Sequence, residues 1–360
     1  YAFCPRNLTI HDSIKNRNAF NCRVCCGEAI MPSSLQSPIE IPVNELDLPL
    51  IDISEFPLEF RDHLQYHPEV TKLRDACREW GFFRLVNHGI PVDLLQKVQT
   101  VAKELLSMPT EDKDRATDSY PAESYVRTPA VPPSYETFCF LDLPNSDSVQ
   151  KISARICPNK ETQFSGIETV GKYSSSATDL ASKIMKVILA TLNLDVETFY
   201  RSDFENCKAH LRINGYSSDG KSIGEEALFS HADRGCLTIL LGDEKEGLEI
   251  RSKEGKWFSV KTVSDTLVVN VGDSLKAWSN GRYRSSHHRV VCKGWTDRMS
   301  IALFYAFPND KKIWAPAELV DEEINPRRYK SFTFSDFTHE IRHNTEVKDK
   351  LTALERFAGI

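Results

Sequence analysis

The chain has 360 residues, and its 45 Lys and Arg stand against 51 Asp and Glu, which gives a formal net charge of -6. A chain of this length can bury a full core as one large domain or as two smaller ones. The acidic excess argues against a nucleic-acid partner, which would require a basic face. No run of about 20 apolar residues predicts a membrane span. Six of the ten cysteines stand singly after residue 30, which is typical of reduced thiols and indicates a cytoplasmic protein.

The first 30 residues differ in composition from the rest of the chain. They precede the first methionine, Met31, and hold four basic but only two acidic residues. They contain no apolar stretch followed by a small-residue cleavage site, as a secretory signal would. Cys22, Cys25 and Cys26 could form half a zinc site, but the sequence offers no second ligand pair at a suitable spacing. We therefore expect residues 1–30 to be a disordered or adventitious leader.

Residues 31–200 are predicted to form a helical region with short strands. Apolar side chains recur there at helical spacing in three stretches, and short apolar runs bounded by turn residues indicate strands. The expected elements are, in chain order, a strand at 49–53, a helix at 70–80, a strand at 82–86, a helix at 94–105 and a helix at about 166–192.

A Pro-rich segment at residues 117–150 interrupts these elements. It carries five prolines among several aromatic residues. A loop of this length is usually either disordered or functional. The aromatic residues indicate that this segment is a lid that covers an active site.

Residues 201–310 change from helical to alternating periodicity. Short strands separated by turn signals predict a sandwich or a jelly roll, and Asn280-Gly281 between two of them is a strong hairpin signal. We therefore expect a mixed α/β, mainly β protein with a jelly-roll (double-stranded β-helix) core at 201–310, flanked by the N-terminal helices, and a C-terminal tail with a helix at 311–360. The expected strands are at 210–216, 228–241, 248–251, 257–260, 266–271, 275–278, 282–291 and 299–306.

His231 and Asp233 form the nucleus of a predicted metal site. Residues two apart on a strand point to the same face, so the imidazole and the carboxylate converge. A third ligand is available from either His287 or His288 on a later strand, and spacing alone does not choose between them. Two histidines and one carboxylate on one face of a metal form the facial triad of non-haem Fe(II) oxygenases.

A second constellation predicts a pocket for a carboxylate. Arg298 and Ser300 share one face of the last strand, and Arg is the side chain that binds a carboxylate through two parallel hydrogen bonds. An Arg that points into the barrel requires an anion there, because an unpaired buried charge is costly. Asn214 and Tyr216 share a face with Arg212 on the first strand and could complete this pocket.

These motifs, taken in order, resemble the plant 2-oxoglutarate- and Fe(II)-dependent dioxygenase superfamily, which has the isopenicillin N synthase-like fold. The resemblance covers roughly residues 48–310, and the tail at 315–321 and 357–360 is similar to a hormone-oxidising or specialised-metabolism branch. The N-terminal motifs are Pro49-Leu50-Ile51-Asp52 and Trp80-Gly81-Phe82-Phe83 through Val86-Asn87-His88-Gly89-Ile90-Pro91. The C-terminal motifs are His231-Ala232-Asp233, Leu237-Thr238-Ile239-Leu240, Gly272-Asp273, Ser279-Asn280-Gly281-Arg282-Tyr283, His288-Arg289-Val290-Val291 and Arg298-Met299-Ser300.

The resemblance implies a role for each matching residue. His231, Asp233 and His288 would hold Fe(II), with His287 left beside the site. The 2-oxoglutarate co-substrate would be bound by Arg298, Ser300, Tyr216 and Asn214. The family has a tyrosine where this chain has Gly215, but position 215 should face away from the pocket. The implied reaction consumes O2 and 2-oxoglutarate, releases succinate and CO2, and oxidises a small plant metabolite or hormone, with ascorbate as reductant. Hydroxylation is the expected outcome, and desaturation, demethylation and epoxidation remain open.

The predicted substrate contacts come from the Pro-rich segment and from the barrel. They are Tyr125, Phe138 and Phe140 in the former, and Arg212 and Phe304 in the latter. An apolar, ring-containing small acid would suit these side chains. Two alternatives remain open: an oxidase with the same triad that does not consume 2-oxoglutarate, and an inactive jelly roll that only binds its ligand. We expect a monomer with no nucleic-acid or membrane partner.

Overall fold

The structure is a computed structural model that describes residues 44–56, 67–117, 125–127, 134–144, 147–157, 166–218, 222–294, 297–343 and 353–360. All of them lie in one of the two units into which the chain divides, Val43–Ile360. The predicted leader at 1–30 lies outside the described residues, and so do four of the prolines in the Pro-rich segment. The predicted domain boundaries therefore stay predictions.

The helices of the described residues lie mainly before and after the strands of the barrel. The first begins at Pro68, whose fixed φ suits the first turn, and the His67 ring accepts a hydrogen bond from the Glu69 N–H at 3.3 Å. The helices are α1 (Pro68–Glu79), α2 (Val92–Ser107), α3 (Thr110–Asp114), α4 (Ser148–Ile156), α5 (Ile167–Thr191), α6 (Val196–Phe199), α7 (Asp273–Trp278), α8 (Phe334–His343) and α9 (Ala353–Ala358). None of them combines the length and the apolar composition that crossing a bilayer requires.

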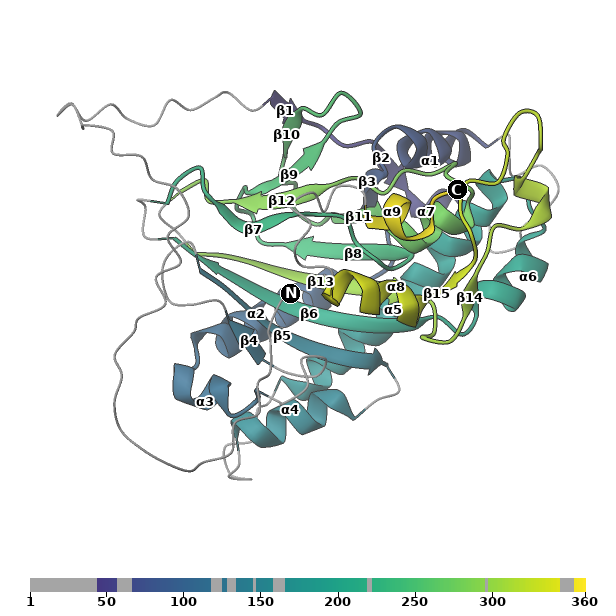
Figure 1. Cartoon of the computed structure of the whole chain (residues 1–360). Coiled ribbons are helices and arrows are strands. Elements are labelled where there is room, and N and C mark those ends of the chain that lie inside the picture. The colour runs from purple at the N-terminus through teal and green to yellow at the C-terminus, as the bar shows by residue number, and fades with distance from the viewer. Residues whose placement is uncertain are drawn as a thin grey trace, which may run out of the picture. The chain divides into compact units, whose positions relative to one another are not determined.

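Most of the strands form two sheets. The larger has eight strands in the order β2-β3-β11-β8-β13-β6-β5-β4, the smaller has five in the order β1-β10-β9-β12-β7, and β14 pairs with β15 alone (Figure 1). The strands are β1 (Asn44–Leu46), β2 (Leu50–Asp52), β3 (Phe82–Val86), β4 (Tyr125–Arg127), β5 (Ser134–Leu143), β6 (Lys208–Ser217), β7 (Glu226–His231), β8 (Leu237–Gly242), β9 (Leu248–Arg251), β10 (Trp257–Val260), β11 (Leu267–Val271), β12 (His288–Val291), β13 (Arg298–Ala306), β14 (Lys312–Ile313) and β15 (Phe332–Thr333).

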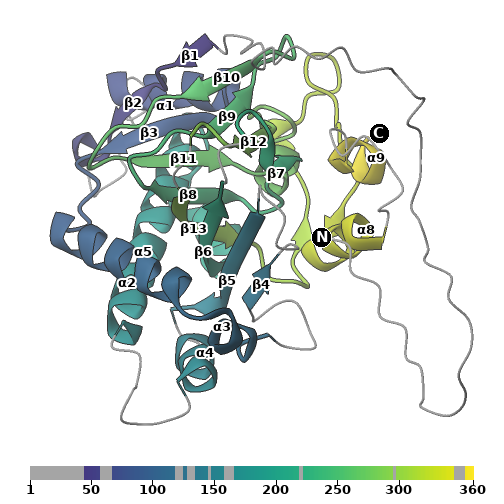
Figure 2. The ribbon, with the colours of Figure 1, turned by 90° about the vertical axis from the view of Figure 1, so that its left-hand side faces the viewer.

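The two sheets face each other across two small apolar clusters. One contains Phe82 of the larger sheet and Ile250 of the smaller, and the other joins Tyr216 to Val290. The opposite face of the larger sheet packs on α2 and α5, which lie side by side (Figure 2), and this side holds the largest core cluster. The jelly-roll prediction is confirmed, and the eight-stranded sheet has an interior face toward the other sheet and an outer face toward the helices.

Three predicted strands differ from the observed elements. The strand predicted at 228–241 is two strands, β7 and β8, joined by a loop at 232–236. The strand predicted at 275–278 is part of helix α7, because a short buried apolar run has no periodicity that separates a strand from a helix. The strand predicted at 282–291 is regular only in β12.

Asn280 does not form the predicted hairpin, since it follows a helix. It has a φ of +54°, in the left-handed region that Asn tolerates. Its buried amide donates to the carbonyls of Leu319, Asn325 and Pro326 at 3.1–3.3 Å, and its Oδ1 accepts the Arg328 N–H at 2.9 Å. The residue therefore fastens the segment that leads to the C-terminal helices.

The described part of the Pro-rich segment is mainly regular structure and not the predicted loop. Residues 134–143 form strand β5, which pairs along β6 in the eight-stranded sheet, and 148–156 form helix α4. The prediction was wrong here because the prolines outside β5 masked the alternation of Tyr135, Thr137 and Cys139 with Phe138 and Phe140.

Candidate active site

His231, Asp233 and His288 lie together at one end of the smaller sheet. His231 ends β7 and His288 begins β12, and the two residues pair directly across these antiparallel strands. The Asp233 Oδ1 atom lies 3.7 Å from His231 Nε2 and 3.8 Å from His288 Nε2. One ligand atom from each residue falls within 4.8 Å of the others, which is close enough to surround one metal ion. The predicted triad is thus assembled, although Asp233 lies in the loop after β7 and not on the strand.

Backbone carbonyls orient both imidazole rings. The His231 Nδ1 atom lies 2.8 Å from the Phe229 carbonyl oxygen, and the His288 Nδ1 atom lies 3.3 Å from that of Ser286. Because a carbonyl oxygen can only accept, each Nδ1 carries the proton and donates it. Each Nε2 then presents its lone pair toward Asp233, which is the arrangement typical of metal-binding histidines.

The Asp233 carboxylate is held at its other oxygen. Its Oδ2 accepts hydrogen bonds from the Thr238 hydroxyl at 2.6 Å and from the Asn270 amide at 2.8 Å. Burial disfavours ionisation of Asp233, but the two imidazoles and these two donors hold its pKa below the ordinary value. Burial, and then the neighbouring His288, lowers the pKa of His231 to about 4. At neutral pH the site therefore offers a carboxylate and a neutral imidazole, and two imidazoles with one carboxylate are the donor set that suits Fe(II).

Helix α7 supports the loop that carries Asp233. The backbone N–H of Asp273 donates to the Asp233 carbonyl at 2.7 Å, and that of Ser274 donates to Gly235 at 3.1 Å. Gly272, just before the helix, donates to Cys236 at 2.9 Å. The loop conformation is therefore fixed by main-chain hydrogen bonds from the start of this short helix.

The predicted carboxylate pocket forms where β6 and β13 pair. Arg298 lies opposite Tyr216, and Ser300 lies opposite Asn214. The Asn214 amide donates to Ser300 Oγ at 3.3 Å, the Tyr216 and Ser300 hydroxyls lie 3.4 Å apart, and the Arg298 guanidinium stands 5.2 Å from the Tyr216 ring centre. Burial raises the pKa of Tyr216 to about 12, so its hydroxyl stays protonated and can donate to an anion.

Arg298 is buried without a carboxylate partner among the described residues. Its exposed fraction is 9 %, and its Nε atom donates a hydrogen bond to the Lys245 carbonyl at 3.4 Å. Arg298 and Tyr216 line a cavity of about 290 Å³. A buried guanidinium beside a cavity favours an anionic ligand there, because burial of an unpaired charge is costly.

Strand β5 adds two residues to this pocket that were not predicted from the sequence. The hydroxyls of Tyr135 and Thr137 both donate to Asn214 Oδ1 at 2.9 Å. They fix which way the Asn214 amide turns, so that its nitrogen faces Ser300. The signal that could have found them is the alternation of β5, in which Tyr135 and Thr137 share a face.

The predicted substrate residues separate into two groups. Arg212 and Phe304 lie on the interior face, and the Arg212 guanidinium stands 5.7 Å from the Phe304 ring centre. In contrast, Tyr125, Phe138 and Phe140 are at most 2 % exposed and belong to the core cluster on the outer face. Their prediction as substrate contacts was wrong, because they point toward the helices and not toward the metal triad.

Gly215 faces away from the pocket, as expected. A Cβ atom there would lie 2.9 Å from a methyl carbon of Leu106 on α2. The departure from the family pattern therefore falls on the helix-packed face of β6. It leaves the interior positions of Asn214 and Tyr216 unchanged.

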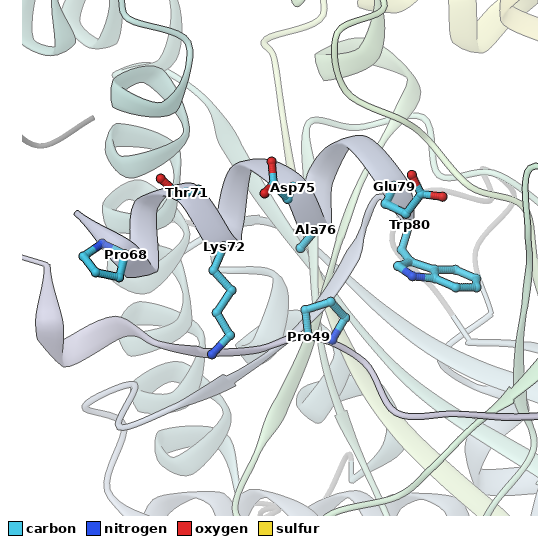
Figure 3. A pocket seen from close by; sticks show the side chains of 8 residues that line it. All are labelled: Pro49, Pro68, Thr71, Lys72, Asp75, Ala76, Glu79 and Trp80. Atoms are coloured by element: carbon cyan, nitrogen blue, oxygen red, sulfur yellow. The ribbon is translucent and has the colours of Figure 1, made fainter. Parts of the chain in front are cut away.

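A second hollow lies away from the triad residues, along α1. It has a volume of about 580 Å³ and is lined by Pro49, Lys72, Asp75, Glu79 and Trp80 among others (Figure 3). None of its lining residues belongs to the triad or to the carboxylate pocket.

Comparison with known families agrees with this geometry. The model of the 2OG-Fe(II) oxygenase superfamily matches residues 207–307, and that of the N-terminal part of non-haem dioxygenases in morphine synthesis matches residues 48–152. A gibberellin 20-oxidase-like protein of Arabidopsis thaliana is 34% identical over 84% of this chain and 94% of its own. The chain belongs to the 2-oxoglutarate/Fe(II) oxygenase superfamily. It is a 2-oxoglutarate-dependent dioxygenase that uses Fe(II).

Relatives with solved structures extend the similarity to the fold. The rice dioxygenase for auxin oxidation has a TM-score of 0.74 and 32% sequence identity, and the match covers 87% of this chain and 100% of that one. JOX2, solved in complex with 2OG, Fe and JA, has a TM-score of 0.69 and 27% identity over 86% of this chain and 90% of its own. The 2-oxoglutarate-dependent dioxygenase DAO of Oryza sativa subsp. japonica is 34% identical over 75% of this chain and 87% of its own.

Proposed function

We propose that this dioxygenase hydroxylates a small carboxylic acid of the plant-hormone or specialised-metabolite type, with an apolar ring. The observation that carries the proposal is the contact between Arg212 and Phe304 on the interior face of the eight-stranded sheet. The guanidinium carbon of Arg212 lies 5.7 Å from the centre of the Phe304 ring. Arg212 is the cation that would bind the acid. The Phe304 ring would pack against the apolar body of the substrate.

The position of Phe304 supports its role as a substrate contact. It pairs across β13 and β8 with Thr238, whose hydroxyl binds Asp233. A substrate ring against Phe304 would therefore lie beside the metal triad. Arg212 lies two positions from Asn214 on β6. The side chain proposed to bind the substrate and the first residue of the co-substrate pocket therefore occupy successive interior positions of one strand.

The residues on either side of the substrate would hold the reacting groups. His231, Asp233 and His288 would bind Fe(II), and Arg298, Ser300, Tyr216 and Asn214 would bind the distal carboxylate of 2-oxoglutarate. When bound, iron and 2-oxoglutarate activate O2 to oxidise a C–H bond, with succinate and CO2 as co-products. The side chains contribute position and charge, and the apolar clusters between the sheets limit the access of water.

The relatives support a hormone-like substrate. Their names include a gibberellin 20-oxidase-like protein and a dioxygenase for auxin oxidation, and JOX2 was solved with JA. We infer from this range that the substrate is of similar size, and the contact between Arg212 and Phe304 supports an acid in particular.

The test is a succinate-coupled screen of plant small acids against the purified enzyme with Fe(II), 2-oxoglutarate and ascorbate. We expect a hit among ring-containing acids, and we expect its methyl ester to be turned over far less well. In the Arg212→Gln variant, KM for the acid should rise while KM for 2-oxoglutarate stays unchanged, and Arg212→Lys should retain part of the affinity. An ester that performs as well as the acid would contradict the proposal, as would product without succinate.

Three further proposals concern the working state of the enzyme. We infer ascorbate as the reductant, a monomer and a cytoplasmic location. Omitting ascorbate should shorten the linear phase of turnover. Light scattering should give the mass of a single chain, 40.9 kDa. A fluorescent fusion of the protein should distribute through the cytosol.

A further inference from the structure

One row of side chains crosses the interior face of the eight-stranded sheet beneath the metal triad. In the paired strands β3, β11, β8 and β13, Phe82 lies opposite Asn270, Asn270 opposite Thr238, and Thr238 opposite Phe304. Cross-strand neighbours on one face touch one another. These four residues therefore form a continuous line from the N-terminal strand to the proposed substrate contact.

Three members of this row contact metal ligands. The Phe82 ring packs edge-on against His288, with ring centres 5.4 Å apart at 71°. Thr238 and Asn270 both donate to the same oxygen of Asp233, at 2.6 and 2.8 Å. Neither donor has another side-chain hydrogen bond among the described residues, so the polar group of each is committed to Asp233.

The sequence around these two donors is otherwise apolar. Thr238 lies between Leu237 and Ile239, and Asn270 lies between Val269 and Val271. Asn270 is 3 % exposed and Thr238 is 5 % exposed, so water cannot readily replace either donor. A buried Asn without a partner would be costly, which means that its contact with the carboxylate accounts for its place in the strand.

We propose that Asn270 and Thr238 are positioning residues that assign the two oxygens of Asp233 to different tasks. The Oδ2 atom is occupied by two hydrogen bonds, and the Oδ1 atom alone faces the two imidazole nitrogens. The carboxylate is thereby prevented from rotating about its Cβ–Cγ bond. Asp233 would then hold a metal through Oδ1 alone, and Oδ2 would not compete with 2-oxoglutarate or O2 for the metal.

The test compares substitutions that remove the hydrogen-bond donor with one that keeps it. Thr238→Val removes the hydroxyl but keeps the shape, Thr238→Ser keeps the hydroxyl, and Asn270→Leu removes the amide. The matched control is Thr266→Val, which deletes a hydroxyl that binds the Val263 carbonyl outside the site. Affinity for Mn(II), measured by titration calorimetry on the metal-free protein, reports on the site without turnover.

We expect Thr238→Val and Asn270→Leu to weaken Mn(II) binding by about 10- to 100-fold, the usual effect of losing a hydrogen bond to a metal ligand. Thr238→Ser and Thr266→Val should bind Mn(II) as the wild type does. A second readout is the ratio of succinate formed to substrate hydroxylated, which should rise in the two damaging variants because a mobile carboxylate disturbs the site.

Two outcomes overturn the proposal. One is wild-type Mn(II) affinity in folded Thr238→Val and Asn270→Leu proteins. The other is equal loss in Thr238→Ser and Thr238→Val, which would assign Thr238 a packing role only. If Asn270→Leu does not fold, the Thr238 pair decides the question. Because Mn(II) binding requires no substrate, failure of the proposed acid substrate leaves this result unaffected.

Discussion

The two faces of the eight-stranded sheet carry different kinds of residue on the same strands. On the interior face, β6 and β13 place Asn214, Tyr216, Arg298 and Ser300 around one pocket. On the outer face, the alternate residues of the same strands, such as Ile213, are fully buried in the core under the helices. Adjacent residues on one strand therefore serve chemistry and folding separately. Substitutions on the two faces should fail in different ways.

The largest effect is expected at the proposed metal ligands. Asp233→Ala or His231→Ala should abolish 2-oxoglutarate turnover and leave the fold intact, because the interior face contributes little to the main core. The measurement is succinate release, together with thermal unfolding.

His287 provides the matched control for these ligands. We expect His287→Ala to retain turnover, since the Nε2 atom of His288, and not that of His287, faces Asp233. An inactive His287→Ala variant together with an active His288→Ala variant would show that His287, and not His288, is the ligand.

The next effect tests the outer face. Phe138→Ala should lower the free energy of unfolding by about 3–5 kcal/mol, the usual cost of truncating a buried Phe, because this ring is fully buried against the Tyr125 ring. KM for 2-oxoglutarate should not change in the protein that stays folded. Denaturant titration measures the free energy of unfolding. A rise in KM would show that the outer face of β5 also affects binding of 2-oxoglutarate on the interior face.

Arg298 tests the interior face at the proposed co-substrate pocket. Arg298→Met should weaken binding of 2-oxoglutarate by about 2–5 kcal/mol, the range for removing one partner of a buried charge pair. The KM for 2-oxoglutarate should therefore rise by at least about 30-fold. Stability should change little, since the described residues give Arg298 no carboxylate partner. Equal KM values for Arg298→Met and the wild type would show that 2-oxoglutarate does not bind in this pocket.

The smallest effect sharpens the contrast within β5. Thr137→Val removes one hydrogen bond to Asn214, and a single such bond contributes about 0.5–1.5 kcal/mol. We expect KM for 2-oxoglutarate to rise by up to about tenfold, with a smaller loss of stability than in Phe138→Ala. A variant that loses stability but keeps its KM would place Thr137 among the structural residues.

The sequence predicted the site better where residues carry their chemistry in their type. His231, Asp233, Arg298 and Ser300 were selected as candidates because metal and carboxylate binding restrict the choice of side chain, and the structure places the proposed partners together. Thr238 and Asn270 were missed, although each interrupts an apolar strand, because their role depends on the register of β8 and β11. Register is a property of paired strands and is not visible in one strand alone.

The sequence predicted folding less well where local preference is weak. The run from Leu275 to Trp278 is short and apolar, so tertiary packing determined that it is a helix. Phe138 and Phe140 were predicted to touch substrate because they are aromatic. Their burial under the helices could be known only after β5 was placed beside β6.

The anchoring of the C-terminal segment has a consequence for the support of the predicted metal site. Helix α7 holds the Asp233 loop, and its Lys276 forms an ion pair with Glu355 of α9, while Asn280 binds the backbone between 319 and 328. The support of the Asp233 loop therefore depends on contacts that form only when α9 packs against α7. A substitution such as Glu355→Gln, far from the predicted metal site in the sequence, is therefore expected to weaken the support of the Asp233 loop.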